Sequence, residues 1–287
     1  MISSVGLPVR VGPVPGRAEP RIDLADLSIR FRTGAEAIQS VSLSVADGEF
    51  VAIVGPSGCG KTTVLNAIAG LLDPAEVEQR GNIRLEGRPV LASDGKARPG
   101  LGYVFQRDAL LPWRTVLGNV ELGLLIRGMP RAERETRAHA LIDMAGLTGF
   151  EHYYPHQISG GMRQRTSLIR TLAYEPSVVL MDEPFGALDA QNRIILQDEL
   201  LRIWERTRKT ILFVTHDLAE AIVLAQRVIV MSKRPGRVTR VYDIALPAPR
   251  DPLELRGTRA FAELEATIWS SLRDEFRADR RERHTGS

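Results

Sequence analysis

The stretch GPSGCGKTT, residues 55–63, constrains the fold of this chain more than any other feature. It matches the pattern G-x-x-x-x-G-K-[ST], and it stands between an apolar run, FVAIV, and a helical pattern, TTVLNAIAGLL. Glycines at these positions let the backbone curl so that several N–H groups point inward, and a concave loop at a helix N-terminus holds phosphate. The flanking strand and helix make an incidental glycine turn a poor alternative. The sequence therefore predicts a phosphate-binding loop in an α/β fold.

Two side chains of this loop add chemistry that glycine lacks. Lys61 offers a point charge to β- and γ-phosphates, and Thr62 offers a hydroxyl to Mg²⁺. Cys59 is interpreted as a small filler rather than a redox group, although its position predicts that alkylation inhibits ATP hydrolysis and that MgATP protects. We expect the whole loop to bind nucleotide, namely Gly55, Pro56, Ser57, Gly58, Cys59, Gly60, Lys61, Thr62 and Thr63.

Composition and charge narrow the class of protein. The net charge of +3 comes from 38 basic and 35 acidic residues, which is a mixed surface and no nucleic-acid-binding stripe. One cysteine excludes an intrachain disulfide, so the cytosol is the simplest placement. No stretch approaches the roughly 18 consecutive apolar residues of a membrane span. Any role at a membrane is therefore expected to act through a partner.

Apolar patterns along the chain predict a mainly parallel sheet. From residue 22, IDLADLSIRF and AIQSVSLSV alternate as antiparallel strands that lead into the buried strand before the loop. Later apolar runs alternate with helical patterns, which is typical of strands joined by crossover helices. These runs are LGYVFQ at 101–106, SVVLMDEP at 177–184, TILFVTH at 210–216 and RVIVMS at 227–232.

The same patterns predict the domain organisation. Residues 1–20 contain four prolines without periodicity and are expected to form a disordered tail. Residues 21–250 are expected to form the main domain, with a helical subdomain at about 107–160, and 251–287 a helical tail. The helix after the loop is expected to end at Asp73-Pro74.

Polar residues at the ends of the later strands suggest a reaction centre. Asp182 and Glu183 end one apolar run, and ligands bind at the carboxyl edge of a parallel sheet. The first carboxylate suits Mg²⁺, whereas the second can orient or deprotonate an attacking water; a solvated turn is the alternative. His216 ends the next strand and is expected to contact a γ-phosphate rather than serve structure alone. Gln106 also ends a strand, and its amide could reach the metal or the water.

Together these motifs resemble the ATP-binding cassette (ABC) ATPases over about residues 22–245. The resemblance implies the ABC ATPase fold: an α/β P-loop NTPase core with a mainly parallel sheet, an N-terminal antiparallel β subdomain and a helical insertion. It also implies ATP and Mg²⁺ as cofactors, with Lys61 on the phosphates, Thr62 and Gln106 at the metal, Glu183 as general base and His216 as the γ-phosphate switch. The matching segments are residues 55–63, Gln106, Ser159-Gly160-Gly161, Asp182-Glu183, Ala187-Leu188-Asp189 and His216.

The resemblance adds contacts with nucleotide that the residues alone do not suggest. Phe31 is the candidate for stacking on adenine, with core packing as the alternative. Cassettes of the family bind ATP between two copies arranged head to tail, so that Ser159, Gly160 and Gly161 of one face the γ-phosphate of the other. Asp189 belongs to the same expected nucleotide-binding set. Met162 stands where the common motif of the family, L-S-G-G-Q, has glutamine. The chain therefore lacks at this position an amide that could contact the partner's nucleotide.

Two further stretches resemble the importer ATPases for nitrate, sulfonates and taurine. The first stretch resembles them through Leu111-Pro112-Trp113, and the second through the Arg-Pro-Gly turn in MSKRPGRV. The resemblance implies a second cassette, expected in a homodimer, two membrane permease subunits, and indirectly a periplasmic or lipid-anchored solute-binding protein. It places the chain peripherally at the cytoplasmic face of a bacterial inner membrane. Trp113 is expected in the groove that receives a short helix of the permease, with core packing equally weighted.

Two other classes of ABC protein fit the sequence less well. A soluble ABC ATPase acting on nucleic acid or in translation usually carries a coiled-coil insertion or two cassettes, and neither fits here. An ATP-dependent clamp without hydrolysis is disfavoured by Glu183 and His216. We therefore expect an importer ATPase with no nucleic-acid partner, whose transported solute this sequence does not identify.

Overall fold

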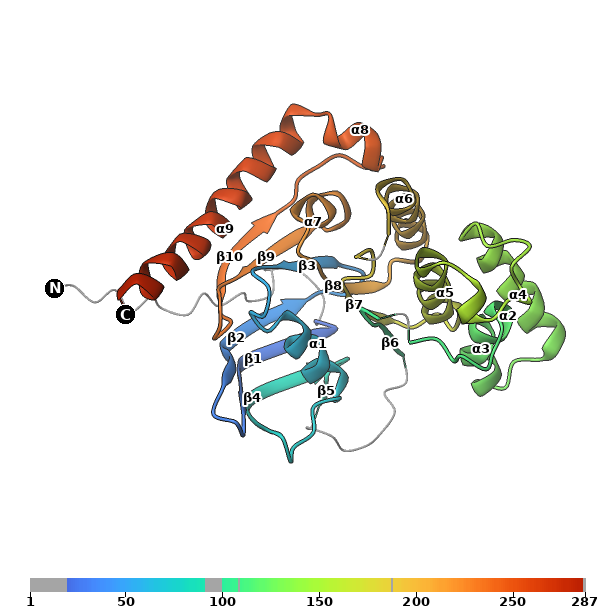
Figure 1. Ribbon diagram of the computed structural model, residues 1–287, viewed down its shortest axis with the longest axis horizontal. Coiled ribbons are helices and arrows are strands. Elements are labelled where there is room, and N and C mark those ends of the chain that lie inside the picture. The colour runs from blue at the N-terminus through green and yellow to red at the C-terminus, as the bar shows by residue number, and fades with distance from the viewer. Residues whose placement is uncertain (1–19, 91–99, 108, 187, 286–287) are drawn as a thin grey trace. The chain divides into compact units, whose positions relative to one another are not determined.

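The computed structural model describes residues 20–90, 100–107, 109–186 and 188–285, with side chains up to residue 273. The chain divides into two compact units, each described by itself below. The first unit comprises residues 1–98, 210–250 and 254–287, and the second comprises 99–209 and 251–253. The expected disordered tail falls, up to residue 19, outside the described residues. Figure 1 labels the elements.

The first unit begins with an antiparallel sheet of strand order β2-β1-β4-β5. Alternate residues of β1 are buried, and a register shift between Leu24 and Leu27, at the positive φ of Asp26, moves the alternation by one residue. This bulge keeps Leu27 and Ile29 on the buried face. The strands are β1 (Ile22–Phe31), β2 (Glu36–Val45), β4 (Val77–Leu85) and β5 (Arg88–Pro89).

The first unit also holds strands in the order β10-β9-β3-β8. β3 (Phe50–Val54) pairs in parallel with β8 (Thr210–Val214) and β9 (Arg227–Met231), and every residue of these three strands is buried. Strands covered on both faces read as continuous apolar runs, which is why the sequence revealed them. β10 (Val238–Asp243) was not predicted; it is antiparallel to β9, and its polar, partly exposed residues are those of an edge strand.

The helices of the first unit include α1 (Lys61–Ala69), α7 (Leu218–Leu224) and the long red helix of Figure 1, α9 (Arg259–Thr285). The expectation that the helix after the loop runs to Asp73-Pro74 was wrong. Gly70 adopts a left-handed φ of 70°, and the N–H groups of Gly70 and Leu71 donate to the carbonyls of Ala67 and Asn66. This hydrogen-bonded cap ends α1 at Ala69. α8 (Pro252–Arg256) is a single short turn.

The second unit combines two parallel strands with a group of helices. β6 (Leu101–Val104) pairs with β7 (Val178–Asp182). The helices are α2 (Val116–Val120), α3 (Leu122–Ile126), α4 (Arg131–Met144), the 3₁₀ turn η1 (Pro155–Gln157), α5 (Gly160–Ala173) and α6 (Ala190–Thr207). The predicted boundaries of the helical subdomain, about 107–160, stay a prediction.

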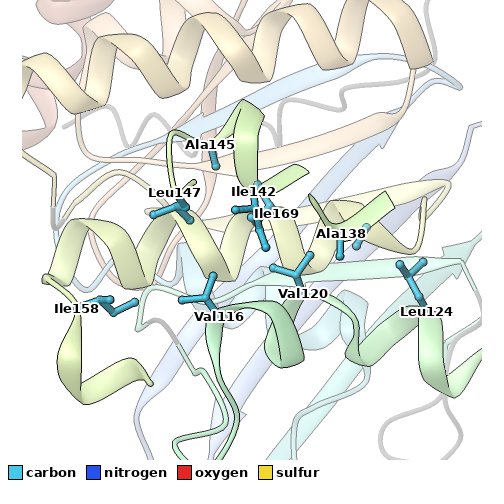
Figure 2. Close-up of a cluster of buried hydrophobic side chains, with 10 residues drawn as sticks. Val116, Val120, Leu124, Ala138, Ile142, Ala145, Leu147, Ile158 and Ile169 are labelled. Carbon is cyan, nitrogen blue, oxygen red and sulfur yellow. The ribbon is translucent and has the colours of Figure 1, made fainter. Parts of the chain in front are cut away.

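A separate apolar core holds these helices together. Figure 2 shows side chains of α2, α4 and α5 meeting, among them Val120, Ile142 and Ile169, which are at most 1% exposed. Burial of apolar area at about 25 cal/mol per Å² is the main stabilising contribution of such a cluster. The segment Ser159-Gly160-Gly161 therefore begins a helix, α5, that packs into this core. Among the described residues, no helix is both long and apolar enough to cross a membrane.

Candidate active site

The phosphate-binding loop leaves β3 and enters α1 with the backbone geometry that its sequence predicts. Gly58 and Gly60 have φ values of 74° and 100°, which other residues rarely adopt. The Lys61 Nζ donates to the carbonyls of Gly55 and Pro56, at 2.9 and 3.0 Å. The third Nζ contact is a long one, 3.9 Å to the Cys59 Sγ, and such a weak hydrogen bond can be exchanged for one to a phosphate oxygen. The loop thus combines two glycines in left-handed conformations, a helix N-terminus and a lysine charge held by backbone carbonyls.

Cys59 is enclosed within this loop. Its side chain is 1% exposed, and its Sγ lies 3.9 Å from the Lys61 Nζ. Burial raises the pKa of the Cys59 thiol, and the nearby Lys61 charge only partly opposes this. Since the thiolate is the nucleophile, the structure makes Cys59 a slowly reacting filler at neutral pH.

His216 and the phosphate-binding loop leave the same edge of the first unit's parallel strands. β8 pairs with β3, Ile53 lies opposite Val214, and the Thr215 N–H donates to the Ile53 carbonyl at 3.2 Å. His216 follows directly and is exposed. Its position is therefore suitable for a contact with a phosphate held by the loop.

Buried polar side chains brace the turn that carries His216, and the sequence reasoning missed them. The Thr215 Oγ1 donates to the Glu220 Oε2 at 2.7 Å, and both residues are at most 4% exposed. Asp217 caps α7 by accepting from the N–H groups of Ala219 and Glu220. Asp followed three residues later by Glu is a helix-start pattern, so this signal was present in the sequence.

A cavity of about 630 Å³ also borders the His216 turn. One side is formed by His216 and the start of α7, and the other by α9, whose helix packs on α7. The α9 residues that line it are Ala262, Glu265, Ala266 and Trp269. The C-terminal helix α9 and His216, the proposed γ-phosphate contact, therefore line the same cavity.

In the second unit, parallel pairing brings Gln106 to Glu183. Val104 of β6 lies opposite Met181 of β7, so residues just beyond both strands meet at one edge. The Gln106 Nε2 donates to the Glu183 Oε2 at 3.3 Å. Glu183 has a φ of 45°, a left-handed conformation that costs a non-glycine residue energy and that clusters at functional sites.

Asp182 precedes this pair and is 3% exposed at the end of β7. Burial, and secondarily the Asp182 charge, raise the pKa of Tyr103 well above its ordinary value. Tyr103 therefore keeps its proton beside the carboxylate, a neighbour that the sequence reasoning did not single out.

Ser159 is the N-cap of α5, and Gly160 and Gly161 form the first turn of that helix. The Ser159 Oγ accepts from the Met162 N–H at 3.2 Å, and a hydroxyl that accepts here can still donate its proton to another group. Met162 packs against the apolar core of Figure 2. This packing explains why an apolar side chain occupies the position that holds glutamine in the L-S-G-G-Q motif of the family.

Asp189 has a capping role of its own. It is the N-cap of α6, and its carboxylate accepts from the Asn192 backbone at 2.9 Å and from the Asn192 side chain at 2.6 Å. These hydrogen bonds hold the pKa of Asp189 below its usual value. The expected contact of Asp189 with nucleotide stays a prediction, and Ala187 of the same motif lies outside the described residues.

Two aromatic candidates differ in exposure. Phe31 at the end of β1 is partly exposed, so it is not enclosed in the core. Trp113 is 71% exposed, which argues against core packing. Its turn is held by the buried Asn119, whose amide donates to the carbonyls of Leu111, Arg114 and Thr115.

The residues predicted to react thus fall in two sets. The first unit brings together the phosphate-binding loop and His216, and the second brings together Gln106, Asp182 and Glu183. No group of three or more His, Cys, Asp or Glu side chains suited to a metal occurs in the part of the chain that the structure describes.

Known proteins match the chain over most of its length. The ABC transporter family model matches residues 38–186. An uncharacterized ABC transporter ATP-binding protein of Methanocaldococcus jannaschii is 49% identical over 240 residues, which are 84% of this chain and 85% of that protein. The chain belongs to the ABC transporter family.

Further relatives carry more specific names. The taurine import ATP-binding protein TauB of Rhizobium johnstonii is 42% identical over 260 residues, 88% of this chain and 95% of that protein. A dimeric ATP-binding cassette, solved in a post-hydrolysis state bound to ADP and Pi, has a TM-score of 0.70 and 33% identity over 79% of this chain and 100% of that one. The predicted ABC ATPase fold is confirmed, and this ABC protein binds and hydrolyses ATP.

Proposed function

We propose that this ABC ATPase drives an importer for a small anionic solute of the nitrate, sulfonate and taurine kind. The structural observation that supports the hydrolysis step is the hydrogen bond between Gln106 and Glu183, because a carboxylate held in one orientation is suited to act as a general base. The names of the taurine import relatives support the direction of transport and the solute class. The chain itself would supply energy, and separate subunits would select the solute.

In the proposed reaction the phosphates of ATP lie in the loop at residues 55–63. Lys61 neutralises phosphate charge, and Glu183 accepts a proton from the attacking water as the water oxygen bonds to the γ-phosphorus. The leaving group is ADP, and the second product is inorganic phosphate. Gln106 holds Glu183 in the orientation that the water requires, while His216 donates to the γ-phosphate. Phe31 stacks on the adenine.

Mg²⁺ fits the donors available in this chain. The proposed ligands are the Thr62 hydroxyl, the Gln106 amide oxygen and the Asp182 carboxylate, all of them hard oxygen donors. Mg²⁺ usually keeps several waters and shares phosphate oxygens, so a few protein ligands are enough to hold it. When bound, the ion would neutralise phosphate charge.

We place Ser159, Gly160 and Gly161 on the γ-phosphate held by a second cassette, in a head-to-tail homodimer. Support comes from the exposed N-terminus of α5 and from the dimeric state of the related cassette. Hydrogen bonds to a charged group contribute about 1.5–3 kcal/mol each. Shifting an open–closed equilibrium from about 1:99 to 99:1 needs about 5.5 kcal/mol. Two or three such bonds at each of two sites supply that amount, and loss of the γ-phosphate removes it.

The exposed Trp113 is proposed to receive a helix of a permease subunit. A tryptophan that is 71% exposed on a turn fixed by Asn119 is a preorganised apolar anchor. Two permease subunits and a periplasmic or lipid-anchored solute-binding protein complete the proposed complex. The chain would then work at the cytoplasmic face of a bacterial inner membrane.

Uptake measurements test the solute class. A strain of the source organism that lacks this chain should lose import of labelled taurine, an aliphatic sulfonate or nitrate. The wild-type chain should restore uptake, and the Glu183→Gln variant should not. Unchanged uptake of all three solutes in the deleted strain would contradict the proposal.

A further inference from the structure

The Arg-Pro-Gly turn at residues 234–236 is a sequence feature that the reaction above leaves without a role. It connects β9 to β10 in the first unit, the unit that also contains the phosphate-binding loop. A backbone hydrogen bond closes the turn: the Ser232 N–H donates to the Arg237 carbonyl at 2.9 Å. The turn is therefore a defined structure with hydrogen bonds of its own.

The Ser232 side chain holds the turn from inside. Its Oγ accepts from the Arg237 N–H at 3.0 Å, and it lies 2.9 and 3.2 Å from the carbonyl oxygens of Lys233 and Pro235, to which its proton can be donated. One hydroxyl thus serves three backbone groups. Removing it would loosen the turn without adding any volume.

Backbone hydrogen bonds tie the same turn to β2. The Gly236 N–H donates to the Ala37 carbonyl at 2.8 Å, and the Gln39 N–H donates to the Gly236 carbonyl at 3.0 Å. Two side chains extend this contact: the Arg234 Nε donates to the Glu36 carbonyl, and the Arg237 Nε donates to the Gln39 Oε1 at 2.9 Å. The turn and β2 therefore form one support.

This support packs directly on the phosphate-binding loop. A Cβ at Gly236 would lie 2.1 Å from the Cys59 carbonyl oxygen, so only glycine permits the observed approach. From the other side, a Cβ at Gly60 would lie 2.5 Å from the Ile38 Cδ1. A Cβ at Gly55 would lie 2.8 Å from the Met231 carbonyl oxygen, at the end of β9. The loop is thus closely approached at Gly55 and at the Cys59–Gly60 segment.

We propose that the turn at 232–237 is a positioning element for the phosphate-binding loop, with Gly236 as its contact with the loop and Ser232 as its internal brace. The turn itself touches no phosphate. It sets the curvature of the Cys59–Gly60 segment, in which the Cys59 N–H donates to the Pro56 carbonyl at 3.3 Å and which leads directly into Lys61 at the start of α1. Small displacements of such a loop lengthen all of its hydrogen bonds to phosphate together.

The first test compares two glycine-to-alanine variants. Gly236 has no positive φ, so Gly236→Ala adds a steric clash without backbone strain. Gly257→Ala is the matched control, because Gly257 lies in the same unit, also lacks a positive φ, and a Cβ there would lie 3.4 Å from its nearest neighbour, the Glu254 carbonyl oxygen.

The readout is the affinity for MgADP by titration calorimetry, which requires no second cassette, together with the thermal midpoint of the ligand-free protein. We expect Gly236→Ala to bind MgADP about tenfold more weakly or worse, with a thermal midpoint close to that of the wild type and Gly257→Ala unchanged. Wild-type affinity in a folded Gly236→Ala variant would overturn the proposal.

A second pair of variants decides the matter even if Gly236→Ala fails to fold. Ser232→Ala removes only the brace and should weaken MgADP binding about threefold, since one hydrogen-bonding group is lost from the support and not from the site. Ser232→Thr keeps the hydroxyl and should restore the affinity. Equal affinities for the wild type, Ser232→Ala and Ser232→Thr would contradict a positioning role.

Discussion

The Gln106 side chain donates to the Glu183 carboxylate at 3.3 Å, and the Glu183 backbone has a left-handed φ of 45°. Parallel pairing of β6 and β7 produces this relationship, since Gln106 and Glu183 follow strands that end at the same edge. In the proposed reaction this pair holds the Glu183 carboxylate in an orientation that suits an attacking water.

Replacing Gln106 with alanine should slow hydrolysis much more than it weakens nucleotide binding, because the proposed phosphate contacts lie in the loop at residues 55–63. Loss of the amide frees the Glu183 side chain, and positioned general bases contribute about 10²–10⁴-fold, so we expect kcat to fall by about 10²-fold. Gln106→Glu should lower kcat further, because it places a second negative charge beside the Glu183 carboxylate. Steady-state kcat and a separate measurement of ATP affinity check this, and an equal loss of both would assign Gln106 to binding alone.

Substitutions of Ser159 and of Lys61 should impair different steps: dimer closure for Ser159 and nucleotide binding for Lys61. Ser159→Arg places a long cation at the exposed N-terminus of α5, where the proposed contact is with the nucleotide of the other cassette. The monomer should therefore still bind ATP, but hydrolysis and dimer closure should be lost. Lys61→Ala removes the charge of the loop itself and should weaken binding. Equal loss of nucleotide binding in the two variants would mean that both residues serve one pocket.

Cys59 should react slowly with alkylating reagents, and its rate should keep rising at alkaline pH. Burial raises the pKa of the Cys59 thiol, so the reactive thiolate is scarcer at each pH than for an exposed cysteine. The rate should still increase beyond about pH 8.5, where an ordinary thiol approaches its plateau.

The measurement is the labelling rate as a function of pH, with and without MgATP. Alkylation should inhibit hydrolysis and MgATP should slow the labelling. Full activity after complete alkylation would show that the loop is not at the nucleotide, and a rate that levels off at neutral pH would contradict the raised pKa.

Trp113→Ala should separate this chain from its permease while sparing the ATPase activity of the isolated protein. Trp113 is 71% exposed, so little internal packing is lost. Ile126→Ala is a matched control, since Ile126 is a 77% exposed apolar residue of the same unit. Co-purification with the membrane subunits and transport rates check the prediction. Wild-type transport in the Trp113→Ala variant would remove Trp113 from the interface.

The sequence revealed the parts of the fold that are buried on both sides. β3, β7 and β8 are continuous apolar runs because every one of their residues is buried, and the polar residues that follow them stand out for that reason. β10 was missed, since an edge strand such as Val238–Asp243 keeps polar residues at several positions. The end of α1 was misplaced because Asp73-Pro74 is a stronger signal in sequence than a left-handed Gly70.

Contacts between distant segments could not be predicted from local patterns. Nothing near residue 236 indicates that its backbone approaches the Cys59 carbonyl, although the glycine was visible. The Gln106–Glu183 hydrogen bond likewise depends on strand pairing and on a φ that sequence does not display. Motif spacing predicted the reactive residues, whereas the contacts that support those residues are visible only in the structure.

Sizing of the Glu183→Gln variant with MgATP tests the central claim most directly. Without a general base the γ-phosphate should persist, so the bonds from Ser159 and its glycines of the opposite cassette should hold the pair together. We predict an ATP-dependent dimer that hydrolyses slowly and that dissociates with ADP. A variant that stays monomeric at high protein concentration in the presence of MgATP would contradict the account.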